Sequence, residues 1–211
     1  MCGVGVGADV AGANKVKVKS PSEKVTTYII PDTREGWCES LRLLINSYFG
    51  GNTVHFDYSE IRPEGAPIKT FGGIASGAKP LIELHEKTRE ILNSQIDQFL
   101  TARNITDIFN LIGKAVVAGN VRRSAEIIIG NPTEEFLDLK NYEKNPDRMD
   151  FGWASNNTVI AELGMDYKDI AKRIAINGEP GLYFLENAKK YGRIRSSEAE
   201  YKDNRVSGLN P

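Results

Sequence analysis

Cysteine and histidine are both scarce in this sequence. Its 211 residues include two cysteines, Cys2 and Cys38, and two histidines, His55 and His85. Two cysteines are too few for a disulfide framework, and without a C-x-x-C pair nothing suggests a zinc site. The histidines lie 30 positions apart with no acidic or thiol cluster beside them, so we interpret both as surface or core residues. Without a D-x-H-x-x-G segment, a corrin bound through a histidine has no support either.

Long apolar runs and an excess of charge of one sign are also missing. No run approaches the roughly 20 apolar residues needed to cross a bilayer. The N-terminus has neither the basic segment nor the apolar core of a secretory signal. With 27 basic and 28 acidic residues, the net charge of -1 provides no overall field for a nucleic acid or a membrane surface. We therefore predict a cytoplasmic protein with neither kind of partner.

The sequence does contain helical patterns that alternate with short β-branched or apolar runs. Such runs are typical of strands, and they occupy residues 24–30, 127–129, 153–163 and 181–187. Helical patterns occupy residues 32–50, about 105–118 and 166–178. Another begins at about residue 80, and a short basic helical stretch runs through residue 190. The run 127–129 has no polar alternation, which indicates a strand covered on both faces. The alternation predicts the α/β fold class.

The first helical pattern carries the clearest local signals. Asp32 followed by Glu35 has the spacing of a capping box, in which each side chain satisfies an otherwise unpaired backbone amide. An apolar stripe follows at positions i, i+4, i+7 and i+11, namely Trp37, Leu41, Leu44 and Tyr48. Cys38 lies on this helix, and we expect it to be buried as a small apolar residue.

Three segments are candidates for ligand contacts, and each has a second interpretation. The glycines of GVGVG, from Gly3 to Gly7, lack dinucleotide-fold spacing. They bring the backbone close to a ligand or to a neighbouring strand. Arg122 and Arg123 either grip a phosphate or base edge, or lie on a solvated face. The proline- and glycine-rich segment 62–77 is long for a simple connection, and its Lys69 either meets a phosphate or is solvated.

Four segments together resemble the ribonucleotide reductases. They occur in the same order as in that family: IRPEGAPIKTFGGIASGAKPL, AVVAGNVRRSAEIIIGN, FGWASNNTVIAEL and NGEPGLYFLENAKKYGR. The similarity covers nearly the whole chain. It is strongest to the adenosylcobalamin-dependent class II enzymes, and among these to the monomeric ribonucleoside-triphosphate reductases. The last segment argues against kinship to glycyl-radical enzymes.

The resemblance implies a fold, a reaction and a set of ligands. The fold would be part of a ten-stranded α/β barrel, with residues 1–211 forming one partial catalytic-barrel domain and about 14–58 an effector-side insertion. The reaction would convert ribonucleotides to deoxyribonucleotides by thiyl-radical chemistry that adenosylcobalamin starts. The implied partners are a ribonucleoside triphosphate substrate, a deoxynucleoside triphosphate effector and the remainder of the reductase chain.

The resemblance also implies roles for individual residues. Cys2, Gly3, Arg122 and Asn210 match substrate-contacting positions, and Asn210 matches an asparagine that hydrogen-bonds the ribose at the catalytic centre. Arg62, Ile68, Lys69, Asn120 and Arg123 match positions near the effector. No residue is implied as a metal ligand.

In the family, the segment similar to the final GLNP continues as Asn-Pro-Cys-x-Glu, where the cysteine becomes the thiyl radical. We therefore expect this chain to carry the specificity segments of a reductase and to act only together with the remainder. An intein or a split gene would leave such an end. The alternative is a non-catalytic nucleotide-binding module or a decayed fragment.

Overall fold

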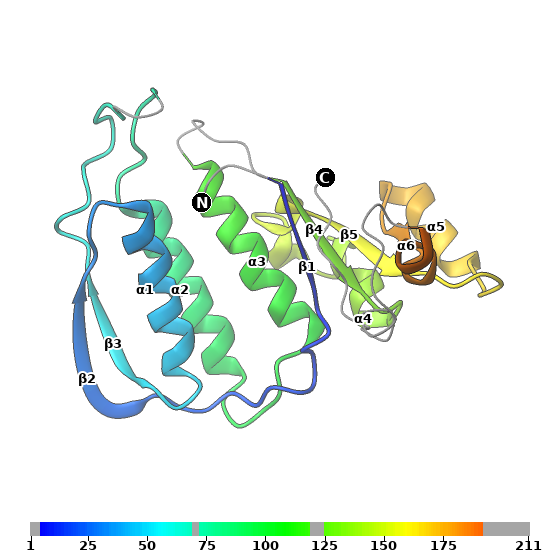
Figure 1. Cartoon of the computed structure of the whole chain (residues 1–211), viewed down its shortest axis with the longest axis horizontal. Coiled ribbons are helices and arrows are strands. Elements are labelled where there is room, and N and C mark those ends of the chain that lie inside the picture. Colours follow the sequence, from blue (N-terminus) through cyan, green and yellow to red (C-terminus); the bar gives the residue numbers. More distant parts are fainter. Residues whose placement is uncertain (1–4, 69–71, 119–124, 192–211) are drawn as a thin grey trace.

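A computed structural model of the chain describes residues 5–68, 72–118 and 125–191. Two parallel sheets flank a layer of helices (Figure 1). The strands are β1 (Gly5–Asp9), β2 (Ser22–Ile29), β3 (Asn52–Asp57), β4 (Ala125–Gly130), β5 (Ser155–Ile160) and β6 (Gly181–Tyr183). The helices are α1 (Arg34–Ser47), α2 (Lys79–Ser94), α3 (Ala102–Val117), α4 (Glu134–Leu137), α5 (Lys168–Asn177) and α6 (Leu185–Tyr191). The predicted α/β class is confirmed.

The larger sheet has the order β1-β4-β5-β6, and every neighbouring pair is parallel. Its central strand pair aligns Ile128 with Asn157. Ile128 and Ile129 are both almost completely buried, which agrees with the expectation of a strand covered on both faces. Parallel strands need long crossover connections, and here α3 lies between β1 and β4 in the sequence and packs on β4 and β5.

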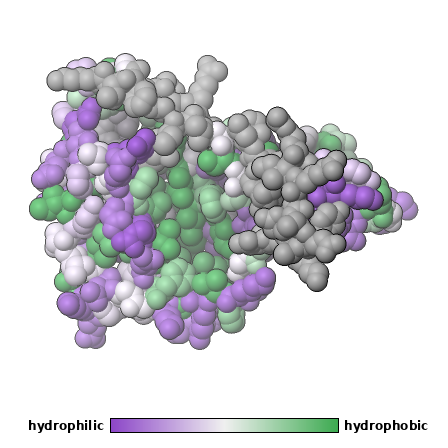
Figure 2. Space-filling model, viewed as in Figure 1, coloured by the Kyte–Doolittle hydropathy of each residue, from purple (hydrophilic) through white to green (hydrophobic). Residues whose placement is uncertain are grey.

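The smaller sheet is the parallel pair β2–β3, which α1 connects as a βαβ unit. The apolar stripe of α1 faces inward, where Leu41, Leu44 and Tyr48 are buried and Trp37 is partly buried. These side chains share one core cluster with Leu81, Leu84 and Leu92 of α2. Figure 2 shows hydrophobic residues on the middle of one face, over the helices that lie between the two sheets.

Several predicted element boundaries need correction. The N-cap of α1 is Thr33, whose Oγ1 accepts a hydrogen bond from Gly36 N, so the predicted Asp32–Glu35 capping box is wrong. The third predicted helix begins at Ala102 rather than near 105, because Thr101 and Asn104 form the capping box there. The strand predicted over 181–187 ends at Tyr183, where helix α6 follows.

Cys38 is exposed, which contradicts the prediction that it is buried. The position falls outside the apolar stripe of α1, since Trp37 and Leu41 mark the inward side and Cys38 lies one position after the first of them. No helix in the described ranges is both long and apolar enough to span a bilayer.

Candidate functional site

One end of the molecule collects the chain segments that the sequence analysis singled out. Helices α1 and α2 begin at this end, and α3 ends there, next to the start of β4 (Figure 1). The segment 58–78 connects β3 to α2, and residues 118–124 connect α3 to β4. Both predicted nucleotide-contacting segments are therefore attached to the same end of the fold, although about 40 residues separate them in sequence.

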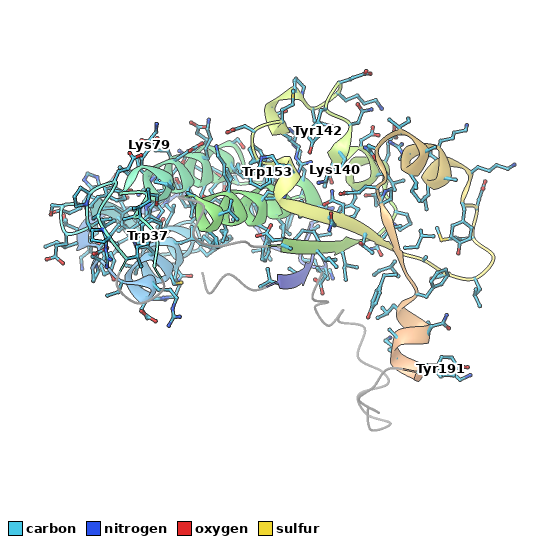
Figure 3. The ribbon with its side chains drawn as sticks, turned by 90° about the horizontal axis from the view of Figure 1, so that it is seen from above. Trp37, Lys79, Lys140, Tyr142, Trp153 and Tyr191 are labelled. Atoms are coloured by element: carbon cyan, nitrogen blue, oxygen red, sulfur yellow. The ribbon has the colours of Figure 1, made fainter. Side chains whose placement is uncertain are left out.

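A cavity of about 150 Å³ lies between the first turns of α2 and the last turns of α3. Three of its lining side chains are charged and the others are apolar. The lining residues are Lys79, Pro80, Glu83, Leu84, Leu111, Lys114, Ala115 and Ala118. Figure 3 shows Lys79 at the surface, far from Lys140 and Trp153. An apolar surface with a few charged groups is the usual composition of a small-ligand site. The volume suits one part of a nucleotide, such as a base or a phosphate group.

Lys114 is held rigidly at this cavity. Its Nζ donates to Glu83 Oε1 at 2.5 Å and to Asp150 Oδ2 at 2.6 Å. Burial by itself lowers the pKa of Lys114, but the hydrogen bonds to Asp150 and Glu83 outweigh this and raise the pKa. Lys114 is therefore a fixed cation. Lys79 has no ion pair with another residue in the described ranges, so its charge is available to an anionic ligand.

The predicted effector residues Arg62 and Ile68 both lie in the segment 58–78. Arg62 Nε donates to Asp32 Oδ2 at 2.6 Å, and both side chains are about one-third exposed. This ion pair ties the segment to the start of α1. The backbone N–H of Ile68 donates to Gly73 O, and its carbonyl accepts from Gly72 N, both at 3.0 Å. Pro67 and Ile74, which flank these residues, form a β-bridge.

The remaining predicted site residues fall outside the described ranges. They are Cys2, Gly3, Lys69, Asn120, Arg122, Arg123 and Asn210. Their roles stay predictions.

The sequence analysis missed three charged residues of this site. Asp32 was assigned to a helix cap, whereas its carboxylate pairs with Arg62. Lys79 and Lys114 were assigned no role, because only the packing of α2 against α3 brings them to one cavity. The position of Lys79 directly before Pro80, at the start of a predicted helix, is the one sequence signal that could have suggested it.

A buried polar layer lies between α3 and the larger sheet. Arg148, completely buried, donates from Nε to Asp107 Oδ1 at 2.6 Å and from an Nη atom to Asn110 Oδ1 at 3.2 Å. Asn110 in turn donates to Ser155 Oγ at 2.7 Å. The layer links α3 to β5 through side-chain hydrogen bonds.

Glu126 of β4 lies at the edge of this layer, opposite Ser155 in the strand register. Its side chain is buried, and its Oε2 has no hydrogen-bond partner in the described part of the chain. Burial raises the pKa of Glu126 to about 8, so the carboxyl is mostly protonated at neutral pH.

Neither His85 nor the cavity provides a site for a corrin. His85 is buried, with Nε2 at 3.0 Å from Ser40 Oγ and Nδ1 at 2.7 Å from Tyr58 Oη, so neither ring nitrogen is available to a ligand. The cavity of about 150 Å³ is also several times smaller than a large cofactor requires.

Comparisons with known proteins all point in one direction. The family model described as "B12-dependent ribonucleotide reductase, insertion domain" matches residues 6–92. A probable adenosylcobalamin-dependent ribonucleoside-triphosphate reductase of Dictyostelium discoideum is 48% identical over 230 residues, covering 100% of this chain and 30% of the relative. The corresponding reductase of Euglena gracilis is 50% identical over 215 residues, covering 100% of this chain and 29% of the relative.

A solved structure leads to the same family. The crystal structure of a B12-dependent (class II) ribonucleotide reductase matches with a TM-score of 0.71 and 35% identity, over 89% of this chain and 28% of that one. The chain thus spans about 30% of the length of the curated relatives that it matches. Sequence and fold together show that this chain is similar, over nearly its whole length, to one section of the class II, B12-dependent ribonucleotide reductases.

Proposed function

We propose that this chain is the nucleotide-recognition section of an adenosylcobalamin-dependent ribonucleoside-triphosphate reductase. The complete protein would replace the ribose 2′-hydroxyl of a ribonucleoside triphosphate with hydrogen. The observation that carries this proposal is the 48–50% identity to such reductases over the whole length of the chain. A decayed or non-catalytic module is not favoured, because the curated relatives reported above are reductases.

The geometry supports effector recognition at the end of the molecule where the cavity lies. The phosphates of a deoxynucleoside triphosphate need cations, and Lys79 lines the cavity without an ion pair to another residue in the described ranges. Arg62, Ile68 and Lys69 would contact the effector from the segment 58–78. The Arg62–Asp32 pair would hold that segment against α1.

The substrate would be recognised by residues that lie before and after the segment 58–78 in the sequence. Arg122 would reach the substrate base, while Asn120 and Arg123 would respond to the effector. Cys2, Gly3 and Asn210 would contact the substrate near the reacting ribose. The βαβ unit of β2, α1 and β3 falls within the proposed insertion 14–58.

Adenosylcobalamin would supply the radical that starts the reaction. The cofactor and the thiyl cysteine would be held by the remainder of the reductase chain. The residues of this chain would bind the nucleotides, orient the base and set selectivity.

The test is activity of the complete reductase that contains this segment. With adenosylcobalamin and a thiol reductant, we expect reduction of ribonucleoside triphosphates, with a substrate preference that changes with the added deoxynucleoside triphosphate. Absence of reduction under these conditions would contradict the proposal.

A variant tests the cavity separately. Lys79→Ala should weaken binding of the deoxynucleoside triphosphate about tenfold, the value of one charge-assisted phosphate contact. Lys172→Ala, which removes an exposed lysine of α5, is the matched control and should leave the Kd unchanged. Equal affinities of the two variants, measured by isothermal titration calorimetry, would remove Lys79 from the site.

A further inference from the structure

Two unfavourable features meet at a single contact between α3 and β4. Gly113 lies in the interior of α3, where glycine is less favourable than alanine. Glu126 places a buried carboxyl in the second position of β4, with Oε2 unsatisfied in the described ranges. A buried polar group without a partner is rare and requires a structural or functional reason.

The contact explains the glycine. A Cβ atom on Gly113 would lie 2.8 Å from Glu126 Oε1 and 2.9 Å from the carboxyl carbon, closer than Cβ atoms approach other atoms. It would also lie 3.1 Å from Ala154 Cβ, so a side chain at position 113 would be crowded by two neighbours. The glycine of α3 therefore forms a notch that accepts the Glu126 side chain.

The groups around this notch do not compensate a charge on Glu126. Burial is the sole cause of its raised pKa, and no cation of α3, β5 or the 152–154 turn pairs with it in the described part. Lys114 is the next residue to Gly113, but its Nζ is bound to Glu83 and Asp150. Glu126 therefore acts here by its shape and by its burial.

The notch lies close in sequence to the segment that is proposed to control nucleotide selectivity. Gly113 lies four residues before the end of α3, and Glu126 is the second residue of β4. The residues 118–124, which include Arg122 and Arg123, connect these two elements in the sequence, so the packing of α3 on β4 sets the separation of the two ends of that segment. A displacement of about 1 Å in a positioning group is enough to cost a large factor in rate.

We propose that Gly113 and Glu126 are positioning residues for nucleotide selectivity: the carboxyl seated in the glycine notch fixes the spacing of α3 and β4, and with it the two attachment points of residues 118–124. The inference rests on the proposed function, since it assigns a determinant of selectivity to the same reductase. Neither residue touches the nucleotide in this proposal.

The experiment uses the complete reductase with adenosylcobalamin. The kcat/KM for two competing ribonucleoside triphosphates is measured with and without the deoxynucleoside triphosphate that favours one of them. Gly113→Ala and Glu126→Ala should each reduce the effector-induced change in the substrate ratio at least about fivefold, the lower end of typical coupling between sites. The kcat for the preferred substrate should remain near that of the wild type.

Two further variants separate shape from charge. Glu126→Gln keeps the shape of the protonated carboxyl and should retain wild-type selectivity. The double variant Gly113→Ala/Glu126→Ala gives the new methyl group room and should recover part of the selectivity that Gly113→Ala loses. Glu134→Ala, at an exposed glutamate of α4, is the matched control and should change nothing.

The outcomes are distinguishable. If the wild type shows no effector-dependent selectivity, the proposed function itself fails. The second case is a wild type that shows effector-dependent selectivity. If Glu126→Ala then keeps the wild-type substrate ratios, or loses activity equally with every substrate, the notch has only a structural role and this inference is overturned. Glu126→Ala carries the test alone should Gly113→Ala fail to fold.

Discussion

At the scale of single residues, His85 is a titratable group whose burial is compensated. Its two ring nitrogens contact Ser40 and Tyr58, and its ring lies 4.4 Å from that of Phe56, centroid to centroid. Burial, followed by the nearby charge of Arg89, lowers the pKa of His85 to about 4. The neutral imidazole is therefore part of the native core of the unit formed by α1, α2 and β3.

The lowered pKa predicts a pH dependence of local stability. Above the usual pKa of about 6.5, His85 is neutral in both the folded and the unfolded state and contributes no pH dependence. As the pH falls from about 6.5 to about 4, the unfolded state binds a proton that the folded state does not bind. The stability of this unit should therefore decrease across that window, by an amount on the order of 3 kcal/mol.

Hydrogen exchange of peptides from α1 and α2, in the complete reductase, would measure this loss between pH 7 and 4. His85→Gln should remove most of the slope, whereas His55→Gln, at an exposed position of β3, should retain it. If the stability of this unit still falls with pH in His85→Gln, other titratable groups cause the effect.

At the scale of elements, Arg148 fixes the segment after α4 against α3. Besides its contacts to Asp107 and Asn110, its guanidinium donates to Leu139 O and lies 5.9 Å from the Phe151 ring centroid. Lys140 adds a hydrogen bond to Gly152 O at 2.6 Å. Figure 3 shows Lys140, Tyr142 and Trp153 gathered on one side of the larger sheet. These polar contacts add to the burial of Leu139 and Phe151 in holding the segment in place.

Removing Arg148 should therefore open this segment. Arg148→Ala leaves the Asp107 carboxylate buried without its main partner, and we expect a loss of about 3–5 kcal/mol. The opening free energy of residues 138–154, from hydrogen exchange in the complete reductase, measures this loss.

Two variants serve as controls for this prediction. Arg42→Ala breaks an exposed ion pair with Glu39 and should cost less than about 1 kcal/mol. Asp107→Asn combined with Arg148→Met removes both charges and should recover much of the stability. No recovery in the double variant would show that the hydrogen bonds of Arg148, and not its charge, dominate.

At the scale of the whole molecule, the larger sheet has two edges in the described ranges. β1 pairs with β4 alone there, and β6 with β5 alone. Leu182 of β6 is 41% exposed, as is Val6 of β1. Unpaired strand edges with exposed apolar side chains are templates for association with other chains.

We therefore predict that the 211-residue chain self-associates when it is produced alone. Sedimentation velocity should show the average mass rising with concentration. Leu182→Lys should reduce this association because it places a charge on an edge strand, whereas Leu163→Lys, at an 83% exposed position outside the strands, should not. A monodisperse monomer at all concentrations would contradict the prediction.

The sequence by itself determined the fold class, the family and most elements. Periodicity is a local property, so the apolar stripe of α1 and the apolar run of β4 were visible in the chain. Gly178 likewise marked the end of α5, where its φ of +81° requires a residue that tolerates the left-handed conformation. The motifs of the reductase family are contiguous in sequence and could be recognised without coordinates.

Tertiary structure alone decided the partners of the polar residues. Asp32 had the right spacing for a helix cap, but Arg62, 30 positions away, binds its carboxylate, and Thr33 caps the helix. Similarly, Lys79 and Lys114 share a cavity, and Gly113 receives Glu126, because α2, α3 and β4 pack together. Hydrogen bonds and close contacts between distant segments depend on how whole elements are placed, and no local pattern records that placement.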